Sequence, residues 1–315
     1  EVFKTVPQDE IYARTGIQFM HFNTLYQLYY LATREPEKLQ NTEMLLQIPD
    51  LFAYFLTGVK KGERTNASTT NMLNPVTREW DVELLEKLGI PARILPPLVD
   101  AGTVYGNLRP ELCKELGLPA VPVIAVGTHD TASAVVAAPA EEADFVYISC
   151  GTWSLFGTES AVPVLTPESE AFNFTNEGGY AGTTRLLKNI MGLWLIQESR
   201  RQWKREGEEV SFNQLEQEAL ASKPFQCFVD VDAPEFEGPG DLPGHVKEYC
   251  RRTGQHVPET RGEVMRCIYE SLAMKYKYTF ENLQKITGKH YHTIHILGGG
   301  IKDGLLCRMT ADACG

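Results

Sequence analysis

The sequence predicts an α/β protein, and three observations favour this class. Two short runs rich in β-branched residues, "VPVIAVG" at 121–127 and "DFVYISCG" at 144–151, are typical of buried strands. Segments with apolar residues at helical spacing alternate with these runs, the longest over 261–286. A third apolar run, "HTIHIL", leads through three glycines into a last helical segment. This alternation is typical of a sheet that is covered by helices.

The composition is that of an ordinary globular protein and excludes several classes of function. Hydrophobic residues make up 43% of the 315 residues and charged residues 23%. No apolar run approaches the roughly 18–20 residues that span a bilayer. The net charge is -11, and the densest basic stretch, 200–209, already turns acidic within itself. We therefore expect a cytoplasmic protein with small-molecule ligands and without a nucleic-acid or membrane partner.

The first 112 residues are expected to be mainly helical. One helix is expected to begin at an Asn23 cap, because apolar residues recur at helical spacing after it. A second has Pro49 in its first turn and ends at Gly58. A third begins at Asp81 and ends at a Gly89 cap. A boundary between two domains is expected in the polar, proline-bearing stretch 139–144.

Two further helices are expected in the second half of the chain. "DTASAVVAAPA", which begins at residue 130, is rich in small residues and is predicted to be helical. "RLLKNIMGLWLIQESRRQWKRE", at 185–206, is predicted to form one long helix.

The cysteines give no metal-ligand pattern. They are odd in number and scattered, without CxxC or Cys/His spacing, which favours reduced, buried thiols. Cys250 and Cys267 would pair only if the fold brought them together. His290 and His292 would share one strand face and His295 the other, so no zinc site is expected there. The cysteines are Cys113, Cys150, Cys227, Cys250, Cys267, Cys307 and Cys314.

Asp130 follows the end of the first apolar run, in "GTHDTASAV". A carboxylate just beyond a strand end is well placed for catalysis in an open α/β sheet. Its other interpretation is an N-cap for the helix that follows, and by itself the sequence favours this simpler role. The two roles are compatible, although a cap bond lowers the basicity of the carboxylate.

Two glycine-containing turns follow the other two strand runs. Gly151 and Thr152 begin a turn whose amides and hydroxyls suit phosphate oxygens, although a plain β-turn needs the same glycine. Gly298–Gly300 let the backbone approach a flat or anionic ligand, although a tight helix–strand crossing needs them too. They match neither the dinucleotide fingerprint nor a P-loop, and no acidic residue lies about twenty positions on. An NAD enzyme is therefore a poor candidate.

The motifs together resemble the FGGY family of carbohydrate kinases. The resemblance runs through the whole chain and includes "NTLYQL", "TNASTTNML", "GTHDTASAV", "SCGTWSL", "NEGGYAG", "KNIMGLW" and "HILGGGIKDG". Within the family the chain is most similar to the L-rhamnulose kinases. This resemblance implies an actin-like ATPase (ribonuclease H-like) fold of two domains, with residues 1–140 in a sugar-binding domain and 141–315 in a nucleotide-binding domain.

The resemblance implies ATP-dependent phosphorylation of L-rhamnulose at its 1-hydroxyl, with Mg²⁺ as cofactor. It implies that Asp130 is the base that accepts the hydroxyl proton, which suits a reaction that depends on positioning and charge neutralisation. ATP would lie between the domains, whose closure would exclude water. The other implied contacts are His129, Thr131 and Asn189 to the sugar, and Thr152, Gln197 and Gly299 to ATP.

Asn189 and Gln197 also have a simpler interpretation. On the predicted helix they lie eight residues apart on similar faces, so both could be polar positions beside an apolar stripe. His129 could equally be a hydrogen-bonded structural histidine, and its place next to Asp130 is what favours a site role.

The chain departs from the family pattern at one point. The family's early Asp-x-Gly-Thr phosphate loop follows a long apolar strand, whereas Asp100–Thr103 follows "ILPPL" and is interpreted as a surface connection. The true loop is expected upstream of Glu1 and further helices beyond Gly315. A polypeptide limited to this piece is therefore expected to show negligible kinase turnover.

Two alternatives to an L-rhamnulose kinase stay open on the sequence. One is an FGGY kinase for another ketose or polyol, such as xylulose, fuculose or glycerol. The other is a non-catalytic, actin-like module that binds nucleotide or sugar, which would need the turns but not a base.

Overall fold

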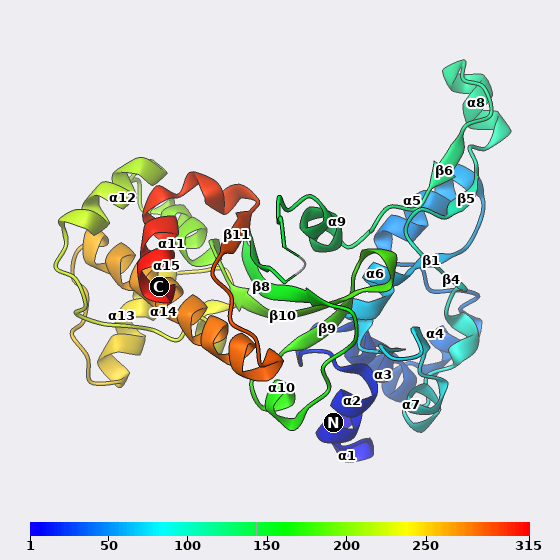
Figure 1. The fold of residues 1–315 in the computed structure, drawn as a ribbon, viewed down its shortest axis with the longest axis horizontal. Coiled ribbons are helices and arrows are strands. Elements are labelled where there is room, and N and C mark those ends of the chain that lie inside the picture. Colours follow the sequence, from blue (N-terminus) through cyan, green and yellow to red (C-terminus); the bar gives the residue numbers. More distant parts are fainter. Residues whose placement is uncertain (143) are drawn as a thin grey trace. The chain divides into compact units, whose positions relative to one another are not determined.

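The structure, a computed structural model, describes residues 1–142 and 144–315. These residues form two compact units that are interleaved in sequence (Figure 1). The first unit comprises Glu1–Pro139 and Thr158–Lys188, and the second Ala140–Gly157 and Asn189–Gly315. The expected functional domains divide the chain only once, near residue 140, and that division stays a prediction.

The first unit is mainly helical over residues 1–57, as expected, but not over residues 58–112, where short helices alternate with short strands and turns. Its helices are α1 Val2–Thr5, α2 Gln8–Thr15, α3 Thr24–Arg34, α4 Pro36–Asn41, α5 Ile48–Thr57, α6 Arg64–Ala67, α7 Val82–Lys87, α8 Pro110–Leu116, α9 Asp130–Val136 and α10 Pro167–Ala171, with the 3-10 turns η1 Ser68–Thr70, η2 Ala92–Ile94 and η3 Tyr180–Gly182. Its short strands are β1 Gly62–Glu63, β2 Leu73–Asn74, β3 Glu79–Trp80, β4 Leu98–Val99, β5 Val104–Asn107, β6 Pro122–Ile124 and β9 Thr175–Gly178.

The second unit alternates strand and helix. It contains β7 Val146–Cys150, α11 Trp194–Arg205, α12 Phe212–Ala221, η4 Pro234–Phe236, α13 Leu242–Arg252, α14 Arg261–Thr287, β11 Ile294–Leu297, η5 Gly299–Lys302 and α15 Gly304–Cys314. Two longer strands, β8 Trp153–Ser160 and β10 Thr184–Met191, have residues in both units.

The largest sheet among the described residues has the strand order β11-β7-β8-β10-β9. β7 and β11 are parallel, with Ser149 opposite Leu297, so their carboxyl ends lie next to each other. β9 and β10 are antiparallel, and Arg185 lies opposite Glu177. These two pairings position the functional residues described below.

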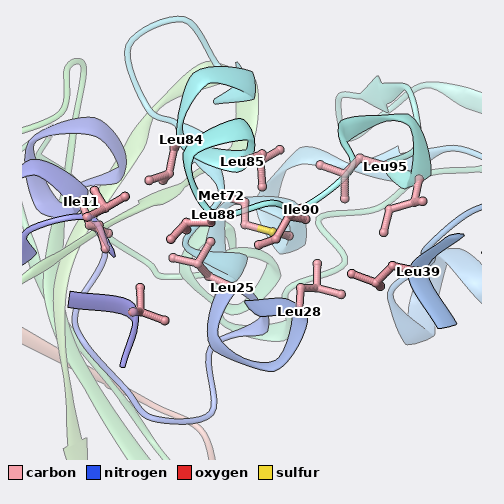
Figure 2. Close-up of a cluster of buried hydrophobic side chains, with 13 residues drawn as sticks. Ile11, Leu25, Leu28, Leu39, Met72, Leu84, Leu85, Leu88, Ile90 and Leu95 are labelled. Atoms are coloured by element: carbon pink, nitrogen blue, oxygen red, sulfur yellow. The ribbon is translucent and has the colours of Figure 1, made fainter. Parts of the chain in front are cut away.

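The main hydrophobic cluster of the first unit gathers side chains from α2, α3, α4 and α7 (Figure 2). Leu25 and Leu84 are fully buried at its centre. The spacing of Leu25 and Leu28 on one face of α3 explains why this helix was predictable. No described helix is both long and apolar enough to cross a bilayer.

The expected ends of α5 and the expected starts of α7 and α14 are confirmed, whereas three capping details are wrong. α5 has Pro49 in its first turn and ends at Gly58, which has a φ of 78°. α14 begins with a capping box between Thr260 and Glu263. Asp81 caps α7, but that helix ends at Lys87 and its C-cap is Leu88 in place of the expected Gly89.

Asn23 occupies the N-cap position of α3 without capping it through its side chain. Its side chain instead accepts from the Met20 amide and donates to the Thr69 carbonyl. The third detail concerns Asp130, which is not a cap, as described below.

The run "VPVIAVG" does not form a buried strand, contrary to the sequence prediction. Only Pro122–Ile124 pair, in a two-stranded antiparallel sheet with β5. Ile124 and Val126 keep 54% and 63% of their surface exposed. β5 and β6 form an arm with α8 at its tip (Figure 1). Asp130 therefore does not follow a strand of the largest sheet.

The segment 185–191 is a strand and not the first half of a long helix. β10 is buried on both faces except at Asn189, so its apolar residues do not alternate with polar ones. A strand of this kind cannot be distinguished from a helix by periodicity alone. The helix begins only at Trp194, after Gly192, where a Cβ would come within 2.7 Å of the Trp153 carbonyl carbon.

Asp50 is a carboxyl group inside the first unit, 1% exposed. It accepts hydrogen bonds from the Glu63 amide at 3.1 Å and from the Tyr105 hydroxyl at 2.9 Å. Burial raises the pKa of Asp50 to about 6, although the two hydrogen bonds act in the opposite direction. The folded protein therefore binds this proton more tightly than the unfolded chain does.

The raised pKa of Asp50 predicts how Asp50→Asn changes stability with pH. Wild-type stability contributed by this group is greatest when Asp50 is protonated and falls as pH rises from about 4 to about 6. Asparagine keeps the acceptor oxygen and removes the titration. The unfolding free energy of Asp50→Asn minus that of wild type should rise by about 2 kcal/mol between pH 4 and pH 7. Urea denaturation at each pH measures it, and a pH-independent difference would contradict the assignment.

Candidate functional site

Glu63 fixes the segment that precedes α9. It is fully buried, and its carboxylate caps α6 by accepting from the amides of Thr65 at 2.9 Å and Asn66 at 3.4 Å. The same carboxylate accepts from the Thr128 amide at 3.0 Å and from its hydroxyl at 2.9 Å. The His129 amide donates to the Thr65 hydroxyl at 3.2 Å. The turn before Asp130 is therefore attached to the start of α6 by three hydrogen bonds.

A buried charge cluster holds the His129 ring. Arg185 on β10 is fully buried, and Glu177 opposite it on β9 is 4% exposed. The Arg185 Nη2 lies 3.2 Å from the Glu177 Oε2 and 2.8 Å from the His129 Nδ1. Its Nε donates to the Gly178 carbonyl at 3.0 Å. Ion pairing with Glu177 compensates the charge of the buried guanidinium.

The contact with Arg185 favours one tautomer of His129. A guanidinium has no lone pair and can only donate, so the 2.8 Å contact with Arg185 favours an Nδ1 that accepts, whereas the Glu177 Oε2, 3.3 Å from the same Nδ1, acts in the opposite direction. In the favoured tautomer the ring proton of the neutral imidazole lies on Nε2. Nε2 is the atom that faces the Asp130 Oδ1, at 3.8 Å. The cluster thus presents an N–H toward the carboxylate that the sequence singled out.

Asp130 is the first residue of α9 and not its cap, because His129 occupies the N-cap position. The N-cap interpretation of Asp130 is therefore wrong. Its Oδ1 accepts from the Thr131 amide at 2.7 Å, and its side chain is 98% exposed. Thr131 is buried, 4% exposed. Asp130 thus presents an exposed carboxylate on a backbone that is held by hydrogen bonds, next to His129, whose ring contacts Arg185.

In the second unit, the turn between β7 and β8 is held against the start of α11. The Gly151 amide donates to the Trp153 carbonyl at 2.8 Å, which closes the turn. The Thr152 carbonyl accepts from the amides of Gly192 at 3.1 Å and Trp194 at 3.2 Å. The Thr152 side chain itself is exposed. Gln197, half-buried, lies one turn along α11 from Trp194.

The three glycines after β11 pack directly on the end of β7. A Cβ on Gly298, whose φ is 84°, would lie 2.9 Å from the Cys150 carbonyl oxygen, and one on Gly300 would lie 2.2 Å from the Cys150 Sγ. A Cβ on Gly299, in contrast, would meet no atom within 4 Å. Gly299 is therefore the one glycine of the three with open space for a side chain, next to the turn that carries Thr152. The glycines lead into the 3-10 segment η5, and α15 begins later, capped by Asp303.

The residues that the sequence predicts to form the site fall into two groups by their position in the structure, and one residue belongs to neither. His129, Asp130 and Thr131 are consecutive in the first unit. The elements of Thr152, Gln197 and Gly299 meet in the second unit. Asn189 lies on β10, half-buried, whereas Gln197 lies on α11, so the prediction that both share one helix face is wrong.

Asp100 is part of the Asp-x-Gly-Thr sequence that resembles the family's phosphate loop. It lies in the turn between β4 and β5. Its two carboxylate oxygens accept from Arg64 at 3.0 Å and from Arg78 at 2.6 Å. Its side chain keeps 52% of its surface exposed. These ion pairs account for the aspartate without a phosphate.

Family models match nearly the whole chain. The C-terminal domain model of the FGGY family of carbohydrate kinases matches residues 146–315, and the N-terminal domain model matches residues 2–137. The chain belongs to the FGGY family of carbohydrate kinases.

Curated relatives at 41–44% identity are rhamnulokinases. The rhamnulokinase of Bacteroides thetaiotaomicron is 44% identical over 99% of this chain and 64% of its own length. That of Oceanobacillus iheyensis is 41% identical over 100% of this chain and 66% of its own length. This FGGY chain therefore spans just under two thirds of the curated relatives that it matches.

Solved structures of sugar and polyol kinases share the fold. Xylulose kinase from Rhodospirillum rubrum superposes with a TM-score of 0.75 at 18% identity, covering 99% of this chain and 62% of that one. Plasmodium falciparum glycerol kinase with ADP gives a TM-score of 0.71 at 16% identity, covering 98% and 62%. These likenesses confirm the two-domain α/β kinase fold.

The FGGY motifs drew attention to His129 and Asp130 but not to their supports. Glu63, Glu177 and Arg185 hold the site from 48 to 66 positions away from His129 in the sequence, and a single sequence does not show such pairs. One signal was present for Glu177, because it lies inside "NEGGYAG", a motif that already marked the family.

Arg185 and Glu177 should depend on each other for stability. Arg185→Met leaves a buried carboxylate, and Glu177→Leu leaves a buried guanidinium, so each should lower the unfolding free energy by about 3–5 kcal/mol. The double variant removes both charges and should cost several kcal/mol less than the sum of the two. A double-mutant cycle by chemical denaturation measures the coupling. Additive costs would contradict the ion pair.

The glycine turn offers a matched pair of substitutions. Gly300→Ala places a methyl group against Cys150 and should cost about 1–3 kcal/mol of stability. Gly299→Ala points into open space and should change stability by less than about 0.5 kcal/mol. Thermal or urea unfolding of the two variants checks this. Equal costs would show that the close approach to Cys150 does not limit residue 300.

Proposed function

We propose that the protein phosphorylates L-rhamnulose at the 1-hydroxyl with ATP, giving L-rhamnulose 1-phosphate and ADP. The observation that carries this proposal is the match to curated rhamnulokinases at 41–44% identity over nearly the whole chain. Identity at this level is far above that to the solved xylulose and glycerol kinases. It favours L-rhamnulose over xylulose, fuculose or glycerol as the sugar.

In this proposal Asp130 accepts the proton of the sugar hydroxyl while the phosphoryl group is transferred. A general base must be open to its substrate, and the 98% exposed side chain of Asp130 meets that need. The hydrogen bond from the Thr131 amide holds the carboxylate while leaving its second oxygen available. Phosphoryl transfer depends mainly on positioning, so a fixed carboxylate suits the reaction.

His129, Thr131 and Asn189 are proposed to position the sugar. The Nε2–H of His129, favoured by Arg185, is a directed donor toward a sugar oxygen or toward Asp130 itself. Thr131 is buried, so its contribution is proposed to come through its backbone and its contact with Asp130. Asn189, half-buried on β10, offers an amide that can both donate and accept.

Thr152, Gln197 and Gly299 are proposed to hold ATP. The exposed hydroxyl of Thr152 and the amides of its turn suit phosphate oxygens. Gly299 leaves room for the adenosine portion to lie against the backbone. Gln197 is proposed to contact the nucleotide from the first turns of α11.

Mg²⁺ is proposed to enter with ATP. It prefers carboxylate, carbonyl and water oxygens and commonly keeps several waters beside substrate phosphates. The turn at Thr152 supplies a hydroxyl and amides, so these residues fit phosphate better than the metal, and we assign no residue of this chain to it. We also propose that the protein acts in the cytoplasm.

Asp130→Asn tests the proposed base. In the full-length protein, this substitution keeps the size of the side chain and removes its basicity, so ATP-dependent ADP release with L-rhamnulose should fall at least about 1,000-fold. L-Rhamnulose binding by calorimetry should change by less than about fivefold. Asp9→Asn is the matched control, because Asp9 is an exposed acid in the first turn of α2 that also accepts from the next amide.

Turnover at the wild-type rate by Asp130→Asn would remove Asp130 from the mechanism. The sugar is tested on the wild-type protein with equal concentrations of L-rhamnulose, xylulose, fuculose and glycerol. L-Rhamnulose is expected to give the highest kcat/KM. A higher value with another sugar would replace the substrate and keep the reaction type.

A further inference from the structure

The loop between β9 and β10 carries an exposed tyrosine whose side chain has no partner within the described residues. Tyr180 lies in η3, the 3-10 turn of this loop, and keeps 49% of its surface exposed. Within residues 1–142 and 144–315, its hydroxyl makes no hydrogen bond and its ring contacts no other ring or cation. A single exposed aromatic residue is common on protein surfaces, so the rigidity and the place of the loop decide whether it has a role.

The loop is closed by hydrogen bonds and by a close contact at a glycine. The Gly179 amide donates to the Thr183 carbonyl at 2.8 Å, and the Thr183 hydroxyl donates to the Glu159 carboxylate at 2.7 Å. A Cβ on Gly179 would lie 2.1 Å from the Thr183 hydroxyl oxygen. Ala181 has a φ of 53°, a conformation that is unfavourable for a residue with a side chain and is typically found where a ligand binds. The backbone on both sides of Tyr180 is therefore held in one conformation.

The same loop is attached to the sugar side of the candidate site. The Gly178 carbonyl, two residues before Tyr180, accepts from the Arg185 Nε at 3.0 Å. The same guanidinium contacts the His129 Nδ1 at 2.8 Å. η3 also packs against α9, which begins with Asp130. Tyr180 therefore lies in the same unit as the proposed base, on an element that contacts the helix of that base.

The proposed sugar has one apolar end. L-Rhamnulose is the 6-deoxy form of L-fructose, so it carries a methyl group where L-fructose carries a hydroxymethyl group. The hydroxyl that reacts is at the other end of the carbon chain. A side chain that recognises the methyl group therefore has to lie within the length of a sugar from Asp130. The face of an aromatic ring suits a methyl group, because the contact buries apolar surface and offers a hydroxyl no hydrogen bond.

We propose that Tyr180 is a specificity-determining residue whose ring contacts the methyl group of L-rhamnulose while Asp130 accepts the proton of the 1-hydroxyl. This inference rests on the proposed function. Because the loop is already closed, the contact forms without the cost of ordering its backbone. An apolar contact of this kind should favour the methyl over the hydroxymethyl group by about 10- to 100-fold, since it cannot fully reject an added hydroxyl.

The test compares L-rhamnulose with L-fructose as substrates of the full-length protein and ATP. The kcat/KM of wild type should be about 10- to 100-fold higher with L-rhamnulose. Tyr180→Ala should lower this ratio to within about threefold, mainly through a higher KM for L-rhamnulose, because the ring contacts ground state and transition state alike. Tyr180→Phe keeps the ring and should keep the ratio. Tyr30→Ala is the matched control, because Tyr30 is 57% exposed and lies on α3, outside the candidate site.

A measurement on the wild type alone keeps the test informative if a substitution prevents folding. With L-rhamnulose and no ATP, saturation of the aromatic protons of the protein should transfer most strongly to the methyl protons of the bound sugar. Weaker transfer to the methyl protons than to the protons at C1 overturns the inference. A wild-type ratio in Tyr180→Ala, with L-rhamnulose still the best substrate of the wild type, overturns the inference alone. A wild type that prefers another sugar overturns the proposed substrate together with it.

Discussion

The burial of the Arg185 charge is the constraint on which the sugar side of the site depends. A guanidinium without water must find its partners inside the protein, and here these are a carboxylate, a carbonyl and an imidazole nitrogen. The antiparallel register of β9 and β10 supplies the first partner, because it places Glu177 directly opposite. The guanidinium, the nearer of the two neighbours of Nδ1, then favours the tautomer of His129 that accepts at this atom. A requirement of folding thus fixes which atom of His129 faces Asp130.

Both halves of the candidate site are rigid for local reasons. In the first unit, one buried carboxylate, Glu63, satisfies the start of α6 and the turn before α9 at the same time. In the second, the ends of the parallel strands β7 and β11 are so close that only glycine fits beside Cys150. The groups proposed to contact substrates, Asp130, Thr152 and Gly299, are exposed on these fixed turns. Such an arrangement exposes the groups that would contact substrates while the backbone that carries them has little conformational freedom.

Much of the fold could be predicted from the sequence wherever a residue pattern is compatible with only one type of secondary structure. The apolar spacing on α3 and on α14 and the β-branched run of β7 were each sufficient to predict the element. β10 was mistaken for a helix because burial on both faces removes the alternation of a strand. The run before Asp130 was mistaken for a core strand because its apolar residues lie exposed on an arm. The acid, histidine and glycines were found from motifs, whereas Glu63, Glu177 and Arg185 depend on contacts between distant segments.

The packing of Gly300 against Cys150 also has an evolutionary consequence. Positions 150 and 300, separated by about half the chain, share one small volume. A larger side chain at either position is therefore tolerated only if the other becomes smaller. A homologous chain with a larger residue at the position of Gly300 should carry a smaller one at that of Cys150. Correlated variation between these two columns of an alignment would then reflect shared space and not a shared chemical role.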